Sequence, residues 1–149
     1  MDLKKIVMDL RNAKGLHGNF PIVVKIPLNQ GHIVSDKAGY YVVAITKNND
    51  LYFHGLSKYR MKYQPQKDFA IKLSAFKNYT FQILNKNLKQ ITLYNENDFL
   101  PFIFFANVKS SYESEYNASY MCKEFDRLKI KEINCIIQND KELVDGKQE

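Results

Sequence analysis

The stretch GYYVVAITKNNDLYFHG, residues 39–55, constrains the fold of this chain more than any other feature. Two runs of β-branched and aromatic residues, the composition of strands, flank a short polar turn. Asn48 and Asn49 tolerate a positive φ, so they predict a two-residue hairpin loop. Neither face of the predicted hairpin is polar. We therefore expect the hairpin to lie in the middle of a sheet that is covered on both sides.

The two-residue loop predicts a register in which Ile45 lies opposite Tyr52 and Val43 opposite His54. Directly opposed residues share a face of the sheet. One predicted face carries Tyr41, Val43, Ile45, Tyr52 and His54, and the other carries Tyr40, Val42, Ala44, Leu51 and Phe53. A slip of one residue would exchange the faces.

The remaining sequence predicts two helices and further strands. Apolar residues at helical spacing, Leu3, Ile6, Val7 and Leu10, predict a helix over 2–14. A second helix is predicted over 111–130 by the capping box Ser110–Glu113 and the apolar stripe Ala118, Met121, Phe125 and Leu128. Strands are predicted over 20–27, 32–35, 69–73, 79–84, 90–94, 102–108 and 131–138.

This order of elements predicts an α+β fold. Few connections are long enough for a parallel crossover, so the sheet is expected to be mostly antiparallel. We expect a curved sheet or half-barrel of about six to eight strands, with an N-terminal helix and a longer C-terminal helix (111–130). The length predicts a single domain, residues 1–138, and the polar end, residues 139–149, reads as a mobile tail.

Positive charge is unevenly placed along the chain. The net charge is +6, with +9 in residues 1–111 and −3 in residues 112–149. A basic body attracts nucleic acid or an acidic protein. The chain has 19 lysines against 3 arginines, together with 14 asparagines, a bias typical of AT-rich coding DNA. We therefore expect a protein of a low-GC bacterium or its mobile elements.

The segment KYRMKYQPQK, residues 58–67, is the strongest candidate for a binding surface. If it is extended, its first three cations share one face and its aromatic residues the other. Cations would meet phosphates, and tyrosine rings would stack on exposed bases. The structural alternative is an edge strand that its lysines protect from aggregation. The predicted binding residues are Lys58, Tyr59, Arg60, Lys62, Tyr63 and Lys67.

The sequence carries only weak candidates for catalysis. His54 ends a predicted strand beside the basic segment and is a conceivable general base. Glu124 and Arg127 share a helix face, where a surface ion pair is the alternative reading. The three histidines and two cysteines lack metal-ligand spacing, and no phosphate-binding glycine loop occurs. We expect no metal and no cofactor, and we expect both cysteines to be packed, free thiols.

Two family resemblances rest on short stretches. GYYVVAITKNNDLYF, NYTF and the Glu124-x-x-Arg127 spacing resemble ribosome-inactivating N-glycosidases, in which two tyrosines sandwich an adenine. Tyr41 would be the first tyrosine, the second has no counterpart, and KEFDR stands where that family has Glu-Ala. Separately, YYVVAITKNNDLYFHG followed by strands and one C-terminal helix resembles bacterial pleckstrin-homology-like domains.

These observations predict a small non-enzymatic interaction protein of the inhibitor or immunity type. It would bind a protein, such as a nucleic-acid-handling enzyme, or RNA or DNA through its basic, tyrosine-containing surface. The alternatives are a metal-free RNA-directed enzyme, such as a toxin-like ribonuclease or N-glycosidase, and a simple nucleic-acid-binding module. The sequence has no membrane span and no secretory signal, so a cytoplasmic location is expected. The oligomeric state is left open.

Overall fold

The strands of the protein form one sheet with the order β4-β3-β2-β1-β7-β6-β5-β8. The computed structural model describes residues 3–16, 21–28, 36–105 and 114–133, and these contain eight strands. They are β1 (Ile22–Ile26), β2 (Gly39–Ile45), β3 (Asp50–Leu56), β4 (Phe69–Lys72), β5 (Asn78–Ile83), β6 (Leu88–Tyr94), β7 (Phe99–Phe105) and β8 (Lys131–Glu132). All neighbours are antiparallel except β5 and β8. The predicted α+β class with a mostly antiparallel sheet is confirmed.

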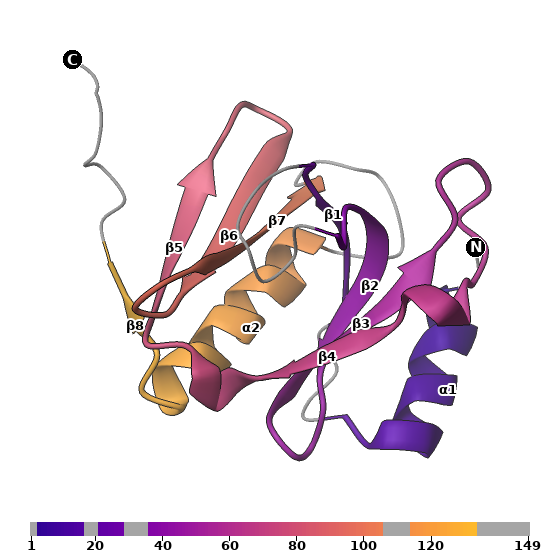
Figure 1. Ribbon diagram of the computed structural model, residues 1–149, viewed down its shortest axis with the longest axis horizontal. Helices are drawn as coiled ribbons and strands as arrows, with labels where there is room; N and C mark the ends of the chain where they lie inside the picture. The colour runs from indigo at the N-terminus through magenta and orange to yellow at the C-terminus, as the bar shows by residue number, and fades with distance from the viewer. Residues whose placement is uncertain (1–2, 17–20, 29–35, 106–113, 134–149) are drawn as a thin grey trace.

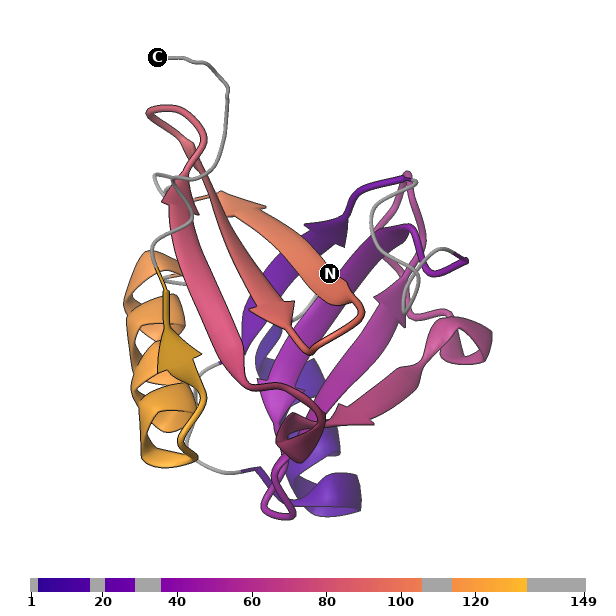
Figure 2. The ribbon, with the colours of Figure 1, turned by 60° about the vertical axis from the view of Figure 1, so that its left-hand side comes forward.

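The sheet opens between β1 and β7, where its two halves meet. These strands share a single register pair, Lys25 with Ile103. Continuing that register by two residues sets Pro27 against Pro101. Neither proline has a backbone N–H to donate, so the ladder stops there. Beyond this point β5, β6 and β7 fan away from the first four strands, as Figure 2 shows.

One face of the sheet holds the main core beneath α2 (Ser114–Arg127). The predicted stripe is confirmed for Ala118, Met121 and Phe125, which are fully buried. They pack with aromatic side chains of the central strands, among them Phe53 and Phe102. Cys122 is also buried there as a free thiol, as predicted. This packing fixes α2 across the sheet (Figure 1).

The other face is covered by α1 (Leu3–Lys14). Ile6 and Val7 of α1 pack against Val42 and Leu56, which form a second, smaller core. Val42 lies between residues of β2 that point into the main core, so α1 and α2 cover opposite faces. Leu10 is buried, and the predicted apolar face of this helix is confirmed for the residues from Ile6 to Leu10.

The β2–β3 hairpin has a register one residue away from the predicted one. Val42 lies opposite His54 and Val43 opposite Phe53, so the turn has three residues, 47–49. Asn49 takes the positive φ of 63°, and Thr46 Oγ1 accepts from the Asp50 N–H at 3.2 Å. The slip exchanges the faces of β3. Phe53 points into the main core, whereas Tyr52 and His54 lie on the α1 side.

Several predicted boundaries need correction. β7 begins at Phe99, three residues before the predicted start, and Pro101 lies inside it. The C-terminal helix ends at Arg127, and the Ile130 N–H bonds back to the Phe125 carbonyl at 2.9 Å. Lys129, with φ of 69°, closes this helix end. Of the predicted strand at 131–138, the structure shows β8 over Lys131–Glu132, and residues 134–138 lie outside the described residues.

Some predictions lie outside the described residues. They are the first helix residue, 2, the strand residues 20 and 106–108, the strand at 32–35, the capping box Ser110–Glu113, the helix residues 111–113, Cys135 and the tail 139–149.

Candidate functional site

The predicted binding segment begins as a tight loop after β3 rather than as an extended strand. The Ser57 N–H donates to the Lys62 carbonyl at 2.7 Å, and the Lys62 N–H donates to Ser57 Oγ at 3.0 Å. Met61 has a φ of 53°, which turns the chain at the tip of the loop. We name residues 57–64 the β3 loop. The expectation of cations on one extended face is therefore wrong for this segment.

All six predicted binding residues nevertheless line one pocket, of about 980 Å³, which we name the basic groove. Strand β1 and the residues that follow it form the opposite wall and add a cation that sequence reasoning missed, Lys25. The groove is lined by Lys25, Ile26, Pro27, Leu28, Ala38, Gly39, Tyr40, Ser57, Lys58, Tyr59, Arg60, Lys62, Tyr63, Gln64 and Lys67.

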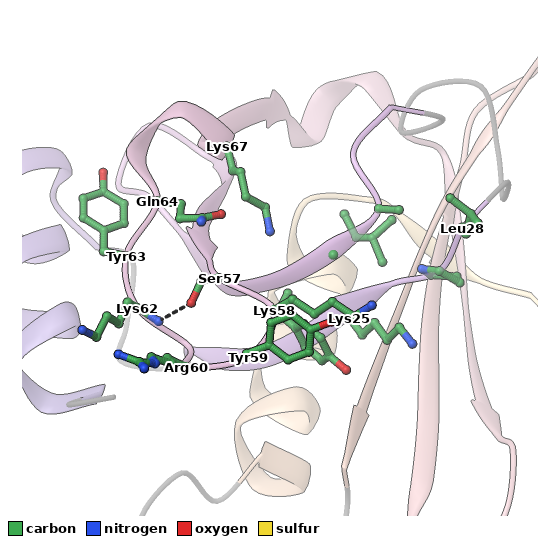
Figure 3. A pocket seen from close by; sticks show the side chains of 15 residues that line it. Lys25, Leu28, Ser57, Lys58, Tyr59, Arg60, Lys62, Tyr63, Gln64 and Lys67 are labelled. Atoms are coloured by element: carbon green, nitrogen blue, oxygen red, sulfur yellow. Dashed lines mark hydrogen bonds between the residues drawn. The ribbon is translucent and has the colours of Figure 1, made fainter.

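The charged and aromatic side chains at the rim of the groove form two groups (Figure 3). Lys25, Lys58 and Tyr59 lie together, whereas Arg60 and Lys62 extend to the other side of the loop. Tyr59 is 87% exposed, and Lys58 Nζ lies 5.5 Å from the centroid of its ring. Within the described part of the chain, no carboxylate pairs with Lys58, Arg60 or Lys62. Their charge is therefore available to an anionic partner.

Lys67 differs from the other cations of the groove because its ammonium group is bound to the protein itself. Its Nζ donates to the Leu56 carbonyl at 2.6 Å and lies 4.9 Å from the centroid of the Tyr41 ring. Burial lowers the pKa of this ammonium group below its ordinary value. Lys67 therefore holds β3 and the following 3-10 turn (Pro65–Lys67) together.

Asp68, which sequence reasoning missed, holds the base of the β3 loop. Its Oδ2 accepts from the Tyr52 hydroxyl at 2.7 Å and the Tyr63 hydroxyl at 2.5 Å, and its Oδ1 accepts from the Gly55 N–H at 2.7 Å. Burial and the hydrogen bond to this carboxylate raise the pKa of Tyr63 to about 12. One signal was present, because Asp68 is the only acidic residue between Asp50 and Glu96.

His54 lies beneath the β3 loop, on the α1 side of the sheet. Its imidazole is stacked on the Tyr63 ring, with centroids 3.9 Å apart and planes 8° apart. The residue is only 5% exposed, and its Nε2 has no hydrogen-bond partner within the described part of the chain. Burial lowers the pKa of His54, and the carboxylates of Asp68 and Asp9 act in the opposite direction. The imidazole therefore gives up its proton more readily than an exposed histidine does.

The structure does not bring the three weak catalytic candidates together. Glu124 and Arg127 form the ion pair that their spacing predicts, with Arg127 Nε donating to Glu124 Oε1 at 2.7 Å. They lie on α2, whereas His54 lies on the face of the sheet that α1 covers. A mechanism that uses His54 and Glu124 on one substrate therefore has no support in this arrangement.

Three further observations on the described residues concern metal binding, membrane spanning and thiol chemistry. No group of three or more His, Cys, Asp or Glu side chains within them is arranged to hold a metal ion. Neither described helix is long and apolar enough to cross a membrane. Burial raises the pKa of the Cys122 thiol to about 12, which keeps it protonated.

Comparison with known proteins yields no match. No family model, no curated protein and no solved structure matches this chain. The functional argument therefore rests on the basic groove and its surroundings.

Proposed function

We propose that this chain is a non-enzymatic interaction protein that binds single-stranded nucleic acid in the basic groove. The observation that carries the proposal is the position of Tyr59. The residue is 87% exposed, and its ring lies beside Lys58 and Lys25 at the rim of a concave surface. An exposed ring is a platform on which an unstacked base can lie, and stacking of this kind contributes about 1–3 kcal/mol per base.

The cations of the groove suit a phosphate backbone. Lys58 and Lys25 lie on one side of the β3 loop, and Arg60 and Lys62 lie on the other. A strand that crosses the loop beside Tyr59 would therefore meet positive charge before and after the stacked base. Each phosphate contact releases condensed counterions, so binding should weaken steeply as salt is added.

A second candidate partner is an acidic protein segment, which would make the chain an inhibitor or immunity-type protein. The apolar side chains of the groove favour this alternative. Ile26, Pro27 and Leu28 lie beside the cations, and Leu28 is 69% exposed. Protein interfaces commonly place apolar anchors within a polar rim. Nucleic acid is preferred here because a tyrosine ring that is exposed among lysines suits a base better than it suits an apolar side chain.

Fluorescence anisotropy with labelled oligo(dT) and oligo(U) of about 12 nucleotides tests the proposal, because single-strand grooves of this kind cover about 4–16 nucleotides. The affinity should fall as salt rises from about 50 to about 200 mM. Tyr59→Ala should weaken binding about tenfold, as expected for one lost stack. Lys58→Ala should weaken binding and reduce the slope of log Kd against log salt by about 0.7, the value for one single-strand phosphate contact.

Lys4→Ala is the matched control, since Lys4 is an exposed cation of α1 that lines neither the groove nor the cavity described below. It removes the same charge and should leave the affinity nearly unchanged. Equal effects of Lys4→Ala and Lys58→Ala would contradict a localised site. If no oligonucleotide binds at low salt, a labelled peptide of alternating Glu and Leu tests the acidic protein segment in its place.

A further inference from the structure

A second cavity lies on the far side of the β3 loop, between this loop and α1. It has a volume of about 570 Å³, and we name it the α1 cavity. Ile6, Leu10 and Ala13 form its helical wall, while Met61 belongs to the loop. Pockets that hold small molecules have volumes of about 300–1,000 Å³ and combine apolar walls with a few polar groups. The size and lining of the cavity therefore suit a small ligand rather than a polymer.

The aromatic side of the cavity is held rigidly. Tyr63 stacks on His54 with one face, and 49% of its surface remains exposed. Asp68 fixes the hydroxyl of Tyr63 and that of Tyr52, whose side chain also lines the cavity. Rings that are fixed in this way lose little entropy when a planar group packs against them, which favours binding.

His54 supplies a polar group that the fold itself leaves unused. The residue lines the cavity and is 5% exposed, and its Nε2 is covered and has no hydrogen-bond partner among the described residues. A buried polar atom without a partner is rare, because its desolvation is not compensated. A ligand with a hydrogen-bonding edge would provide that compensation.

The charges around the cavity favour an anion. Lys14, Arg60 and Lys62 line it, and none of the described carboxylates pairs with any of them. Lys14 Nζ lies 5.2 Å from the centroid of the Tyr52 ring, so positive charge lies close to the aromatic side. Asp9 is the one acidic residue in the lining. The balance of charge at this site is therefore positive.

We propose that the α1 cavity binds a small anion with a planar heteroaromatic ring, of the nucleoside monophosphate class. The ring packs against the edge of the stacked Tyr63 and His54 rings, and a shift of the side chains that cover His54 Nε2 lets the ligand bond to that atom. The phosphate lies among Lys14, Arg60 and Lys62. This site adjoins the basic groove and shares Arg60, Lys62 and Tyr63 with it, whereas Lys58 and Tyr59 line only the groove and Ala13 lines only the cavity.

Isothermal titration calorimetry with AMP, and with inorganic phosphate for comparison, tests this proposal on the full chain. AMP should bind with a dissociation constant below about 1 mM. Phosphate should bind at least about tenfold more weakly, since it lacks the ring contacts, which is a difference of about 1.4 kcal/mol. Ala13→Phe fills the cavity from an exposed helix position and should weaken AMP binding at least about tenfold.

Asn12→Phe is the matched control, because Asn12 is exposed on the same helix and does not line the cavity. It should leave AMP binding unchanged, as should Tyr59→Ala. Both Ala13→Phe and Asn12→Phe should retain oligonucleotide binding, so the two sites are judged independently. Failure of AMP to bind, equal affinity for AMP and phosphate, or unchanged AMP binding by Ala13→Phe would each overturn the proposal. Loss of AMP binding in Tyr59→Ala would place AMP in the groove and overturn it too.

Discussion

The ring of Tyr63 lies flat on the imidazole of His54, with centroids 3.9 Å apart. This stack joins the β3 loop to the strand from which the loop emerges. Tyr63 lines both the basic groove and the α1 cavity, so the stack separates the two sites and supports both. Asp68 fixes the outer end of Tyr63 and thereby sets the height of the loop above the sheet.

We expect Asp68→Asn to destabilise the protein by about 1.5–3 kcal/mol, the range for hydrogen bonds to a charged group. An asparagine has one acceptor oxygen, whereas Asp68 accepts from the two tyrosine hydroxyls through one oxygen and from the Gly55 N–H through the other. With its NH₂ group toward the Gly55 N–H the amide sets donor against donor, and turned the other way it loses the two bonds that the tyrosine hydroxyls now donate to the carboxylate. The free energy of unfolding, measured by urea denaturation, checks this expectation.

The control for Asp68→Asn is Asp36→Asn, which removes the same charge. The Asp36 side chain is 79% exposed and lies 4.0 Å from Lys37 Nζ. Exposed pairs of this kind contribute little, so the change should be within about 0.5 kcal/mol of the original stability. Equal losses in both variants would mean that the three donors do not depend on Asp68.

The hairpin illustrates what the sequence can predict and where it stops. Its strands were predicted within a residue, because β-branched and aromatic runs are clear signals. The register was predicted wrongly by one residue. Asn48 and Asn49 both tolerate a positive φ, so the sequence suits a two-residue and a three-residue loop equally well. In the structure only Asn49 of the two has a positive φ. The hydrogen bond from the Asp50 N–H to Thr46 Oγ1 also helps to close this turn. One residue of slip moved His54 from the predicted face to the face that α1 covers.

We expect the protein to lose stability as pH falls below about 6.5, because burial lowers the pKa of His54 in the folded state. In this range the unfolded chain binds the extra proton and the folded chain does not. The contribution is fully present above the unfolded pKa and is lost as pH falls through the folded pKa. Asp68 and Asp9 face the imidazole and reduce the effect without reversing it.

The pH effect is measured by comparing the original chain with His54→Phe, which keeps a ring on Tyr63 and removes the titration. Urea denaturation at about pH 7.5 and about pH 5.5 brackets the unfolded pKa. The difference in stability between the two pH values should be smaller in His54→Phe. An identical difference in both proteins would assign the pH dependence to other groups.

Replacement by methionine should reduce stability at Lys67 but not at Lys62. Lys67→Met removes the hydrogen bond to the Leu56 carbonyl and should cost about 2 kcal/mol of stability. Lys62→Met, at an exposed position, should change stability by less than about 0.5 kcal/mol. Oligonucleotide binding should weaken in Lys62→Met. Thermal unfolding and anisotropy measured on both variants check the pair, and full stability in Lys67→Met would contradict its role in the wall.

The candidate site was predictable only where its residues are adjacent in sequence. The alternation of cations and tyrosines in residues 58–67 marked the groove, since all six residues line it. Lys25 joins them only because the sheet places the end of β1 beside the loop. The α1 cavity depends on a helix packing against β3, which no local pattern specifies. Asp68 had a signal in its isolation among basic residues, but its partners come from two other elements.

Gly55→Ala should destabilise the protein by about 1–3 kcal/mol, the usual cost of overpacking. A Cβ at this position would lie 2.5 Å from Lys67 Cβ and 2.7 Å from the Gln64 carbonyl oxygen. The Gln64 N–H also bonds to the Gly55 carbonyl at 2.9 Å, so the loop cannot retreat without breaking that bond. Ala70→Ser, a small change at an exposed position of β4, should alter stability by less than about 0.5 kcal/mol. Urea denaturation measures both, and unchanged stability in Gly55→Ala would mean that the wall of the groove is loose enough to move.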